Sequence, residues 1–182
     1  ERGHLLALGL ARLRRFAPDL RAIGLSATVA QPEDLRRWLV AQDGSLPMAE
    51  MIEVKGGAKP EIMILDSKER VPWAGHSARY SIGELYQAIK AHKTTLLFVN
   101  TRSQAELLFQ ELWRVNEDTL PIALHHGSLD VGQRRKVEKA METGSLRAIV
   151  ATSTLDLGID WGDVDLVVHV GAPKGASRLA QR

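Results

Sequence analysis

Short apolar runs alternate with longer amphipathic segments over residues 81–170, and this alternation constrains the fold more than any other feature. In the longer segments, apolar residues recur at i, i+3, i+4 and i+7, the spacing of one helix face. The short runs are continuously apolar, which is typical of strands buried on both faces of a parallel sheet. The alternation predicts βαβ units, so the expected fold class is α/β with a parallel sheet. The predicted strands are 96–99, 121–125, 147–152 and 166–170.

The predicted helices of this region carry signals at their ends. Ser81 and Glu84 have the S-x-x-E spacing of a capping box, and Thr101 can cap the helix that follows it. Gly144 follows the predicted helix 130–143, at a position where the backbone often needs a left-handed conformation. These signals place one helix before the strand 96–99 and a helix in each of the next two connections between strands.

The pattern of residues 1–80 is less regular. Proline and glycine punctuate residues 42–80 and mark loops and a linker. The predicted elements are a helix at 4–17, a buried strand at 20–25, a helix from Pro32 to about Ala41, and short strands at 51–54 and 62–65. We therefore divide the chain into an N-terminal part at 1–55, a linker and edge segment at 56–80, and a C-terminal domain at 81–182.

Small and hydroxyl-bearing residues follow the predicted strands. Parallel α/β sheets bind ligands at the carboxyl ends of their strands, and the helix N-termini there offer free N–H groups to phosphate oxygens. Contacts of this kind suit a nucleic-acid backbone and read no base sequence. The simpler alternative is that these residues only cap helices. The segments are Ser26-Ala27-Thr28, Asn100-Thr101-Arg102, His126-Gly127-Ser128, Thr152-Ser153-Thr154 and Gly171-Ala172-Pro173.

Taken in order, five segments resemble the conserved motifs of superfamily 2 helicases. They are Ser26-Ala27-Thr28 (motif III), Leu96 to Arg102 (motif IV), His125 to Leu129 (the conserved turn of the second RecA-like domain), Ala151 to Asp160 (motif V) and Gln181-Arg182 (the start of motif VI). The chain is most similar to the large helicase-related (Lhr) group of DExH-box helicases. Within that group, the run from Gly171 to Arg182 resembles the ligase-associated subgroup.

The resemblance implies a RecA-like second lobe at 81–182, preceded at 1–55 by the tail of the first RecA-like lobe. It implies that the full-length protein is an ATP-dependent helicase of DNA repair that uses ATP and Mg²⁺ and moves 3′-to-5′ along single-stranded DNA. It further implies a cytoplasmic location and a DNA ligase or nuclease as a partner. The alternatives are an RNA helicase of the same superfamily and a non-catalytic helicase-like module that binds nucleic acid or protein.

The same resemblance assigns roles to residues of this chain. ATP binding falls to Gly158, Asp160, Gln181 and Arg182. Nucleic-acid binding falls to Thr101, Arg102, His126, Gly127, Thr152 and Ser153. Coupling between the two lobes falls to Ser26, Ala27 and Thr28. For the segment 158–160, an ordinary turn is the simpler alternative.

Two motifs of the family are missing from the sequence. There is no G-x-x-x-x-G-K-[ST] phosphate loop and no D-E-x-H box, so the chain carries neither the phosphate cradle nor the acids that hold Mg²⁺ and water. We read the chain as a piece of a helicase core that begins after the D-E-x-H box and ends before the later arginines of motif VI. We expect this polypeptide alone to bind no cofactor and to hydrolyse no ATP.

Composition excludes several other classes of protein. The chain has no Cys among its 182 residues, which excludes a disulfide scaffold and Cys-ligated zinc. The longest apolar run falls short of the roughly 18 residues that a membrane span needs. The net charge of +2 indicates no particular partner. The aspartates at 156, 160, 163 and 165 do not have calcium-loop spacing, and the adjacent residues 125 and 126 face opposite ways on a strand, so we predict no metal site.

Overall fold

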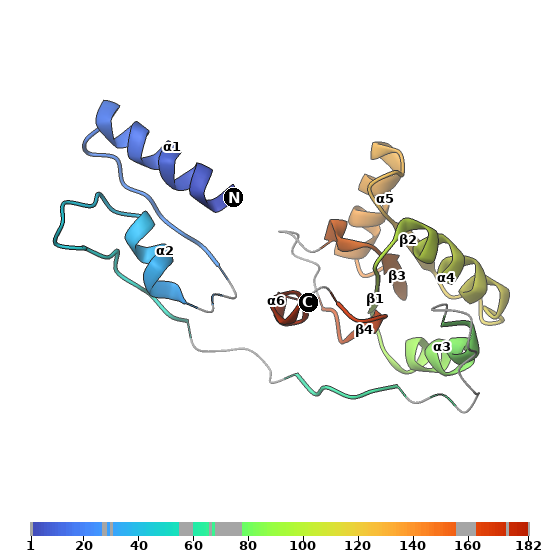
Figure 1. The fold of residues 1–182 in the computed structure, drawn as a ribbon. Helices are drawn as coiled ribbons and strands as arrows, with labels where there is room; N and C mark the ends of the chain where they lie inside the picture. Colours follow the sequence, from blue (N-terminus) through green and yellow to red (C-terminus); the bar gives the residue numbers. More distant parts are fainter. Residues whose placement is uncertain are drawn as a thin grey trace. The chain divides into compact units, whose positions relative to one another are not determined.

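A computed structural model describes residues 2–26, 29, 31–54, 60–65, 67, 78–155, 163–173 and 175–181. The chain divides into two compact units, Glu1–Glu61 and Ile62–Arg182. Figure 1 shows the helices and strands of both units.

The Glu1–Glu61 unit contains two helices, α1 (Arg2–Phe16) and α2 (Pro32–Trp38). Pro32 begins α2, where its missing N–H leaves no helical bond unmade, and the acidic side chains of Glu33 and Asp34 lie at the positive end of the helix dipole. The helix ends three residues before the predicted Ala41.

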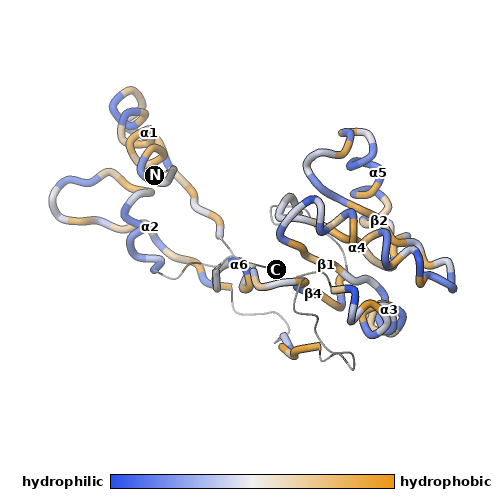
Figure 2. Tube along the Cα trace, turned by 45° about the vertical axis from the view of Figure 1, so that its right-hand side comes forward, coloured by the Kyte–Doolittle hydropathy of each residue, from blue (hydrophilic) through white to orange (hydrophobic). Residues whose placement is uncertain are grey.

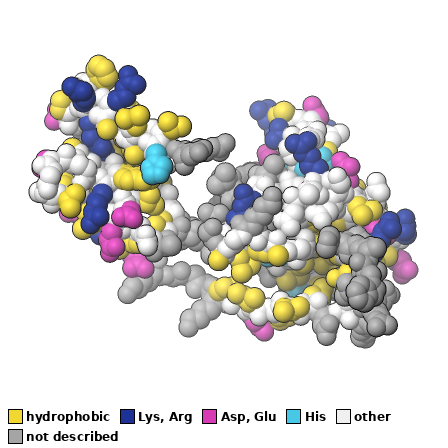
Figure 3. All heavy atoms as spheres, viewed as in Figure 1, with side chains coloured by type: hydrophobic (Ala, Val, Ile, Leu, Met, Phe, Trp, Pro, Cys, Tyr) yellow, Lys and Arg dark blue, Asp and Glu magenta, His cyan; other side chains and the backbone are white. Residues whose placement is uncertain are grey.

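The predicted strands at 20–25, 51–54 and 62–65 are wrong, because the structure forms no strand in these segments. A strand needs a neighbour for its backbone hydrogen bonds, and the described residues of these regions supply none. Apolar side chains are consequently open to solvent, with Ile23 86% and Leu25 95% exposed. Figure 3 shows hydrophobic side chains across the surface of this unit.

The Ile62–Arg182 unit contains a four-stranded sheet in the order β2-β3-β1-β4. Every neighbouring pair of strands is parallel, which confirms the predicted α/β fold class. Each strand agrees with its prediction to within one residue at either end. The strands are β1 (Thr95–Val99), β2 (Ile122–His125), β3 (Ala148–Ala151) and β4 (Leu166–Val170).

As predicted, α3 precedes β1, α4 connects β1 to β2, and α5 connects β2 to β3. The glycine at position 144 adopts φ of +65° just after α5, the left-handed conformation expected there. The capping box predicted at Ser81 does not form, because Ser81 Oγ donates instead to the carbonyl of Ala78, 3.1 Å away. The helices of this unit are α3 (Ile82–Ala91), α4 (Arg102–Arg114), α5 (Val131–Glu142), α6 (Ala176–Gln181) and the 3-10 turns η1 (Ala78–Ser81) and η2 (Ser153–Leu155).

The sheet of this unit is buried on both faces. Side chains alternate along β1, so Leu97 packs against α3 and α4 while Phe98 packs in a second cluster with Met141 of α5. Figure 2 shows the hydrophobic strands within this arrangement. Burying one such side chain contributes about 1.5–3 kcal/mol, so these two clusters supply the main driving force for folding the unit. No helix in the described part of the chain is long and apolar enough to cross a membrane.

Candidate nucleic-acid and nucleotide interface

The carboxyl ends of β1, β2 and β3 lie side by side at one end of the sheet. The register pairs Ala151 of β3 with Phe98 of β1 and with His125 of β2. Beyond the strands, Thr152 N donates a 3.3 Å hydrogen bond to His125 O. The residues that follow these strands therefore share one edge, where parallel α/β sheets bind ligands. The predicted nucleic-acid-binding residues at this edge, here called the rim, are Thr101, Arg102, His126, Gly127, Thr152 and Ser153.

Thr101 caps α4 with a complete capping box. Its Oγ1 accepts a 3.2 Å bond from Gln104 N, and Gln104 Oε1 accepts a 3.2 Å bond from Thr101 N. The cap uses the hydroxyl oxygen as an acceptor and leaves the hydroxyl proton available to a phosphate oxygen. Capping and phosphate binding are therefore compatible at Thr101. The next residue, Arg102, is exposed in the first turn of α4 and adds a charged donor beside it.

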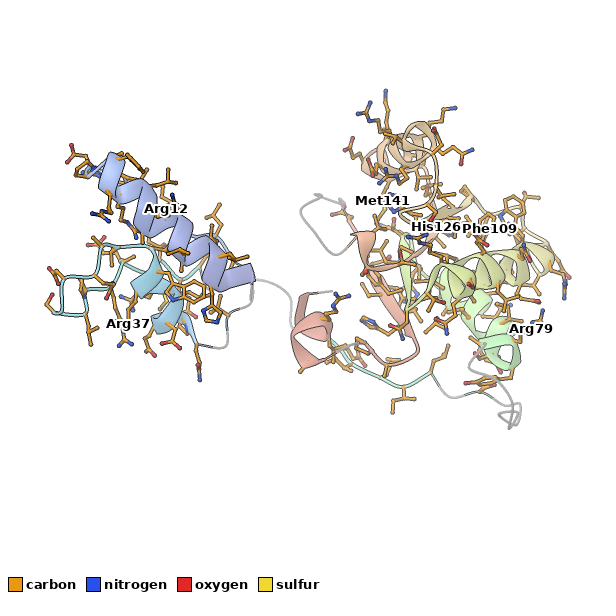
Figure 4. The ribbon with its side chains drawn as sticks, turned by 45° about the horizontal axis from the view of Figure 1, so that its top comes forward. Arg12, Arg37, Arg79, Phe109, His126 and Met141 are labelled. Carbon is orange, nitrogen blue, oxygen red and sulfur yellow. The ribbon has the colours of Figure 1, made fainter. Side chains whose placement is uncertain are left out.

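His126 faces the interior and not the solvent. His126 is labelled in Figure 4. Its side chain is only 2% exposed, its Nδ1 lies 3.3 Å from Ser128 N, and its Nε2 lies 3.3 Å from Glu106 Oε1. A phosphate group cannot reach a ring that is buried in this way. Direct contact from the His126 side chain, as the sequence predicted, is not available in this structure, whereas Gly127 and Ser128 are exposed.

The end of β3 shows the same division between a buried and an exposed residue. Thr152 is 7% exposed, whereas Ser153 is exposed at the start of η2. Ser153 therefore offers its hydroxyl to a ligand at this end of the sheet, whereas Thr152 has little exposed surface and its N–H bonds to β2.

His125 and His126 point to opposite faces of the sheet, as adjacent residues at the end of a strand should. His125 Nε2 lies 3.1 Å from Glu138 Oε1 of α5, while His126 approaches Glu106 of α4. The two rings therefore cannot share one metal ion. Among the described residues, no group of three or more His, Asp or Glu side chains is placed to hold a metal.

Most residues predicted to bind ATP or to couple the lobes lie outside the described residues. They are Gly158, Asp160, Arg182, Ala27 and Thr28, together with the side chain of Gln181 at the end of α6. Ser26 is described and is exposed in the Glu1–Glu61 unit. The roles assigned to these residues stay predictions.

A side-chain hydrogen bond joins the end of β1 to the segment that leads into α6. Asn100 Nδ2 donates a 3.1 Å hydrogen bond to Ala172 O, across 72 positions of sequence. The neighbouring Gly171 has φ of +92°, and a Cβ there would lie 3.2 Å from Asn100 Nδ2. The backbone conformation and the close approach both favour glycine at this position.

Sequence reasoning missed Asn100, Glu106 and Glu138 as residues that organise this edge. Asn100 stood inside a motif, but its partner at Ala172 is distant in sequence. Glu106 and Glu138 occur in helices rich in charged residues, where a carboxylate usually faces solvent. Each helix brings one glutamate towards the end of β2, but this placement depends on the packing of α4 and α5 and is visible only in the folded structure.

Comparisons with known proteins agree with this architecture. Residues 80–182 match the family described as the helicase conserved C-terminal domain. The chain is 35% identical, over its whole length, to the ATP-dependent helicase Lhr-Core protein 2 of Thermococcus barophilus. It is 33% identical, again over its whole length, to the ATP-dependent helicase Lhr-Core of Methanocaldococcus jannaschii.

A solved structure is also similar, that of the Mycobacterium smegmatis helicase Lhr bound to ssDNA and AMP-PNP. The TM-score is 0.70 at 35% sequence identity, and the match covers 97% of this chain and 23% of that one. The chain spans 22% and 21% of the two archaeal relatives. The family match covers more than half of the chain, and these similarities extend over nearly all of it. The chain therefore belongs to the helicase conserved C-terminal domain family, in the Lhr type of superfamily 2 helicases.

Proposed function

We propose that this chain forms part of the motor of a longer ATP-dependent nucleic-acid helicase, here called the parent helicase. The Ile62–Arg182 unit contributes one wall of the nucleotide cleft and part of the track for one nucleic-acid strand. Residues 1–55 form the C-terminal part of the first RecA-like domain, and 56–80 link it to the second, at 81–182. The two archaeal relatives, which are named ATP-dependent helicases, support this assignment.

The observation that carries the proposal is the composition of the rim. Arg102, Gly127 and Ser153 are exposed and follow three adjacent parallel strands. A guanidinium, a glycine backbone and a hydroxyl suit repeated phosphate groups, because all three can donate hydrogen bonds to anionic oxygens and none requires a particular base. The rim therefore binds a strand through its backbone.

Single-stranded DNA is the proposed substrate, with movement 3′-to-5′. The M. smegmatis structure contains ssDNA, which favours DNA over RNA for this chain. Contacts with the nucleic-acid backbone distinguish deoxyribose from ribose only weakly. A direct comparison of DNA and RNA strands of one sequence is therefore the test of this choice.

ATP and Mg²⁺ are the proposed cofactors of the parent helicase. Gly158, Asp160, Gln181 and Arg182 are the proposed contacts of this chain with the nucleotide, and Ser26, Ala27 and Thr28 couple its binding to the strand. The AMP-PNP in the M. smegmatis structure, which is an ATP analogue, supports a nucleotide site. Because this chain has no phosphate loop or D-E-x-H box, it hydrolyses no ATP alone. A cytoplasmic location, a role in DNA repair and a ligase or nuclease partner remain predictions from the ligase-associated resemblance.

The first prediction tests the rim by salt dependence. In the parent helicase, Arg102→Gln should weaken single-strand binding and reduce the slope of log affinity against log salt by about 1, because one phosphate contact is lost. Affinity is measured for DNA and RNA strands across a salt series. Arg114→Gln is the matched control, since it removes the same charge at the opposite end of α4, where Arg114 lies 3.1 Å from Glu111.

The control should keep the wild-type slope. Equal slopes for Arg102→Gln and the wild type would reject the rim as the strand-binding surface. A reduced slope for the control would show that general positive charge, and not the rim, attracts the strand.

A further inference from the structure

We propose that Glu106, acting through the buried ring of His126, positions the Gly127–Ser128 turn for phosphate contact. In this arrangement His126 is a positioning residue and touches no nucleic acid. The inference deepens the proposed function and rests on it.

The two ring nitrogens of His126 have different neighbours. Nδ1 lies 3.3 Å from Ser128 N, and because the amide is the donor, Nδ1 must be the acceptor. In a neutral imidazole the proton is then on Nε2. Nε2 lies 3.3 Å from Glu106 Oε1, an electrostatic contact that does not form a hydrogen bond in this structure. The carboxylate therefore faces the nitrogen that carries the proton.

Because the ring of His126 is buried, its contact with Glu106 is important for the position of the turn. The His126 side chain is 2% exposed and depends on protein groups for its contacts, whereas Glu106 is 57% exposed and reaches the ring from the solvent side. Without the carboxylate, the Nε2 proton would lose the negative charge that faces it, which disfavours this tautomer and this ring orientation. Either change would remove the acceptor from Ser128 N. Glu106 thus acts on the turn through the ring of His126.

The backbone amides of Ser128 and Leu129 already donate hydrogen bonds within the protein. Leu129 N donates a 3.1 Å bond to His126 O, and Ser128 N is used by the ring. Further along, Asp130 Oδ1 accepts from Gly132 N at 2.7 Å and caps α5. These hydrogen bonds fix the backbone of the segment between β2 and α5. The exposed Gly127 backbone and Ser128 hydroxyl remain as the groups that can meet a phosphate.

Electrostatics alone predicts the opposite effect of removing Glu106. An exposed carboxylate beside a strand-binding rim repels phosphate, so its loss should strengthen binding. If Glu106 positions the turn, Glu106→Ala should weaken the binding of the strand. Glu106→Gln separates the two effects, because its amide oxygen can still accept the Nε2 proton while the charge is gone. The sign of the change therefore distinguishes the two explanations.

The second prediction is tested with four variants of the parent helicase. Glu106→Gln should bind single-stranded DNA as well as or better than the wild type, and Glu106→Ala should bind about two- to tenfold more weakly, the effect of one hydrogen bond. His126→Asn should retain more affinity than His126→Gln. An Asn oxygen can accept from the amide two residues later, whereas the longer Gln side chain extends its amide towards Glu106 and does not place its oxygen at the Nδ1 position near Ser128 N.

Two further readouts separate positioning from a general loss of structure. The KM for the DNA strand in stimulated ATP hydrolysis should rise in Glu106→Ala while kcat at saturating strand stays the same. Hydrogen exchange of a peptide that includes Ser128 should become faster in Glu106→Ala and His126→Gln. Glu138→Ala is the matched control, because it removes the carboxylate 3.1 Å from His125 on the other face and leaves the contact between Glu106 and His126 in place.

The control should lose stability without a change in strand KM. Wild-type affinity or stronger binding in Glu106→Ala overturns the inference, and so does weaker binding with unchanged exchange at Ser128. If Arg102→Gln weakens binding and Glu106→Ala does not, only the positioning role fails. If Arg102→Gln leaves binding unchanged as well, the proposed function fails with it.

Discussion

At the scale of single residues, this protein uses side chains mainly to hold backbone in place. Thr101, His126 and Asn100 were all candidates for ligand contact at the strand ends, yet each makes a bond to the chain itself. The exposed hydrogen-bonding groups at this edge belong to their neighbours, such as Arg102 and Ser153. A strand end therefore combines residues that shape the backbone with residues that can meet a ligand.

Asp165 gives a residue-scale prediction at the opposite edge of the sheet. It lies just before β4 and accepts bonds from Lys93 N and Thr94 N, at 2.9 and 2.8 Å, just before β1. Partial desolvation acts to raise the pKa of Asp165, but these amide hydrogens outweigh it and hold the pKa below the ordinary value of 3.8. The ionised form is the one that joins the two strands.

The third prediction follows from this carboxylate. Asp165→Asn should lower the free energy of unfolding by about 1 kcal/mol at neutral pH, a modest effect because solvent screens the group. A depressed pKa stabilises the fold above the unfolded value, and the contribution is lost as the pH falls through the folded value. The difference should therefore shrink below about pH 3.8, the ordinary pKa. Urea unfolding of the chain across pH measures it.

Asp163→Asn is the control, since this residue lies two positions earlier and is exposed. A destabilisation of Asp165→Asn that stays constant into acid would show that the charge is irrelevant. Strand binding should not change in either variant, because both residues lie at the end of the sheet away from the rim.

At the scale of elements, the turn from β4 to α6 depends on a backbone conformation that only glycine adopts readily. Gly171 has φ of +92° and its Cα faces Asn100, whose amide holds Ala172. By contrast, Gly83 in the first turns of α3 has nothing within 4 Å of an added Cβ. The same substitution should therefore have opposite effects at these two positions.

The fourth prediction compares these glycines. Gly171→Ala should destabilise the chain by about 1–2 kcal/mol, because a left-handed backbone crowds Cβ and Asn100 must move. Gly83→Ala should stabilise it by about 0.5–1 kcal/mol, since alanine loses less backbone freedom in a helix. Thermal unfolding of both variants measures the difference. Stabilisation by Gly171→Ala would mean that the turn does not hold its positive φ in solution.

Much of this element-level structure follows from sequence. The four strands of the Ile62–Arg182 unit and the helices between them were predictable because continuous apolar runs and helical spacing are local signals. The strands predicted at 20–25, 51–54 and 62–65 were not formed, because an apolar run indicates burial without showing that a partner strand is present. Ser81 failed as a cap because η1 precedes α3 and takes its hydroxyl.

At the scale of the whole molecule, the two units differ in how much apolar surface they bury. Every buried hydrophobic residue in the described part of the chain lies between Leu85 and Leu155. In the Glu1–Glu61 unit, Phe16 is 84% exposed and α2 contains no buried residue. Because apolar burial is the main source of stability, the two units should open with different free energies.

The fifth prediction concerns hydrogen exchange of this chain. Amides of residues 1–55 should exchange faster than those of 81–182, with the slowest exchange in β1 and β3, whose residues are all buried. Mass spectrometry of peptic fragments over a time course measures both regions in one sample. Equal protection of the two regions would contradict the assignment of the core to the Ile62–Arg182 unit.

The order of elements, the parallel sheet and the row of small residues at its edge are readable from the chain alone, because periodicity and turn chemistry act over a few residues. Which of those edge residues face inward is not readable in this way. His126 turns to Glu106, and Asn100 reaches Ala172, through contacts between segments distant in sequence. Only the packing of α4 against the sheet, and of β4 beside β1, brings these partners within bonding distance, so the division of the rim into positioning and exposed residues is a property of the folded molecule.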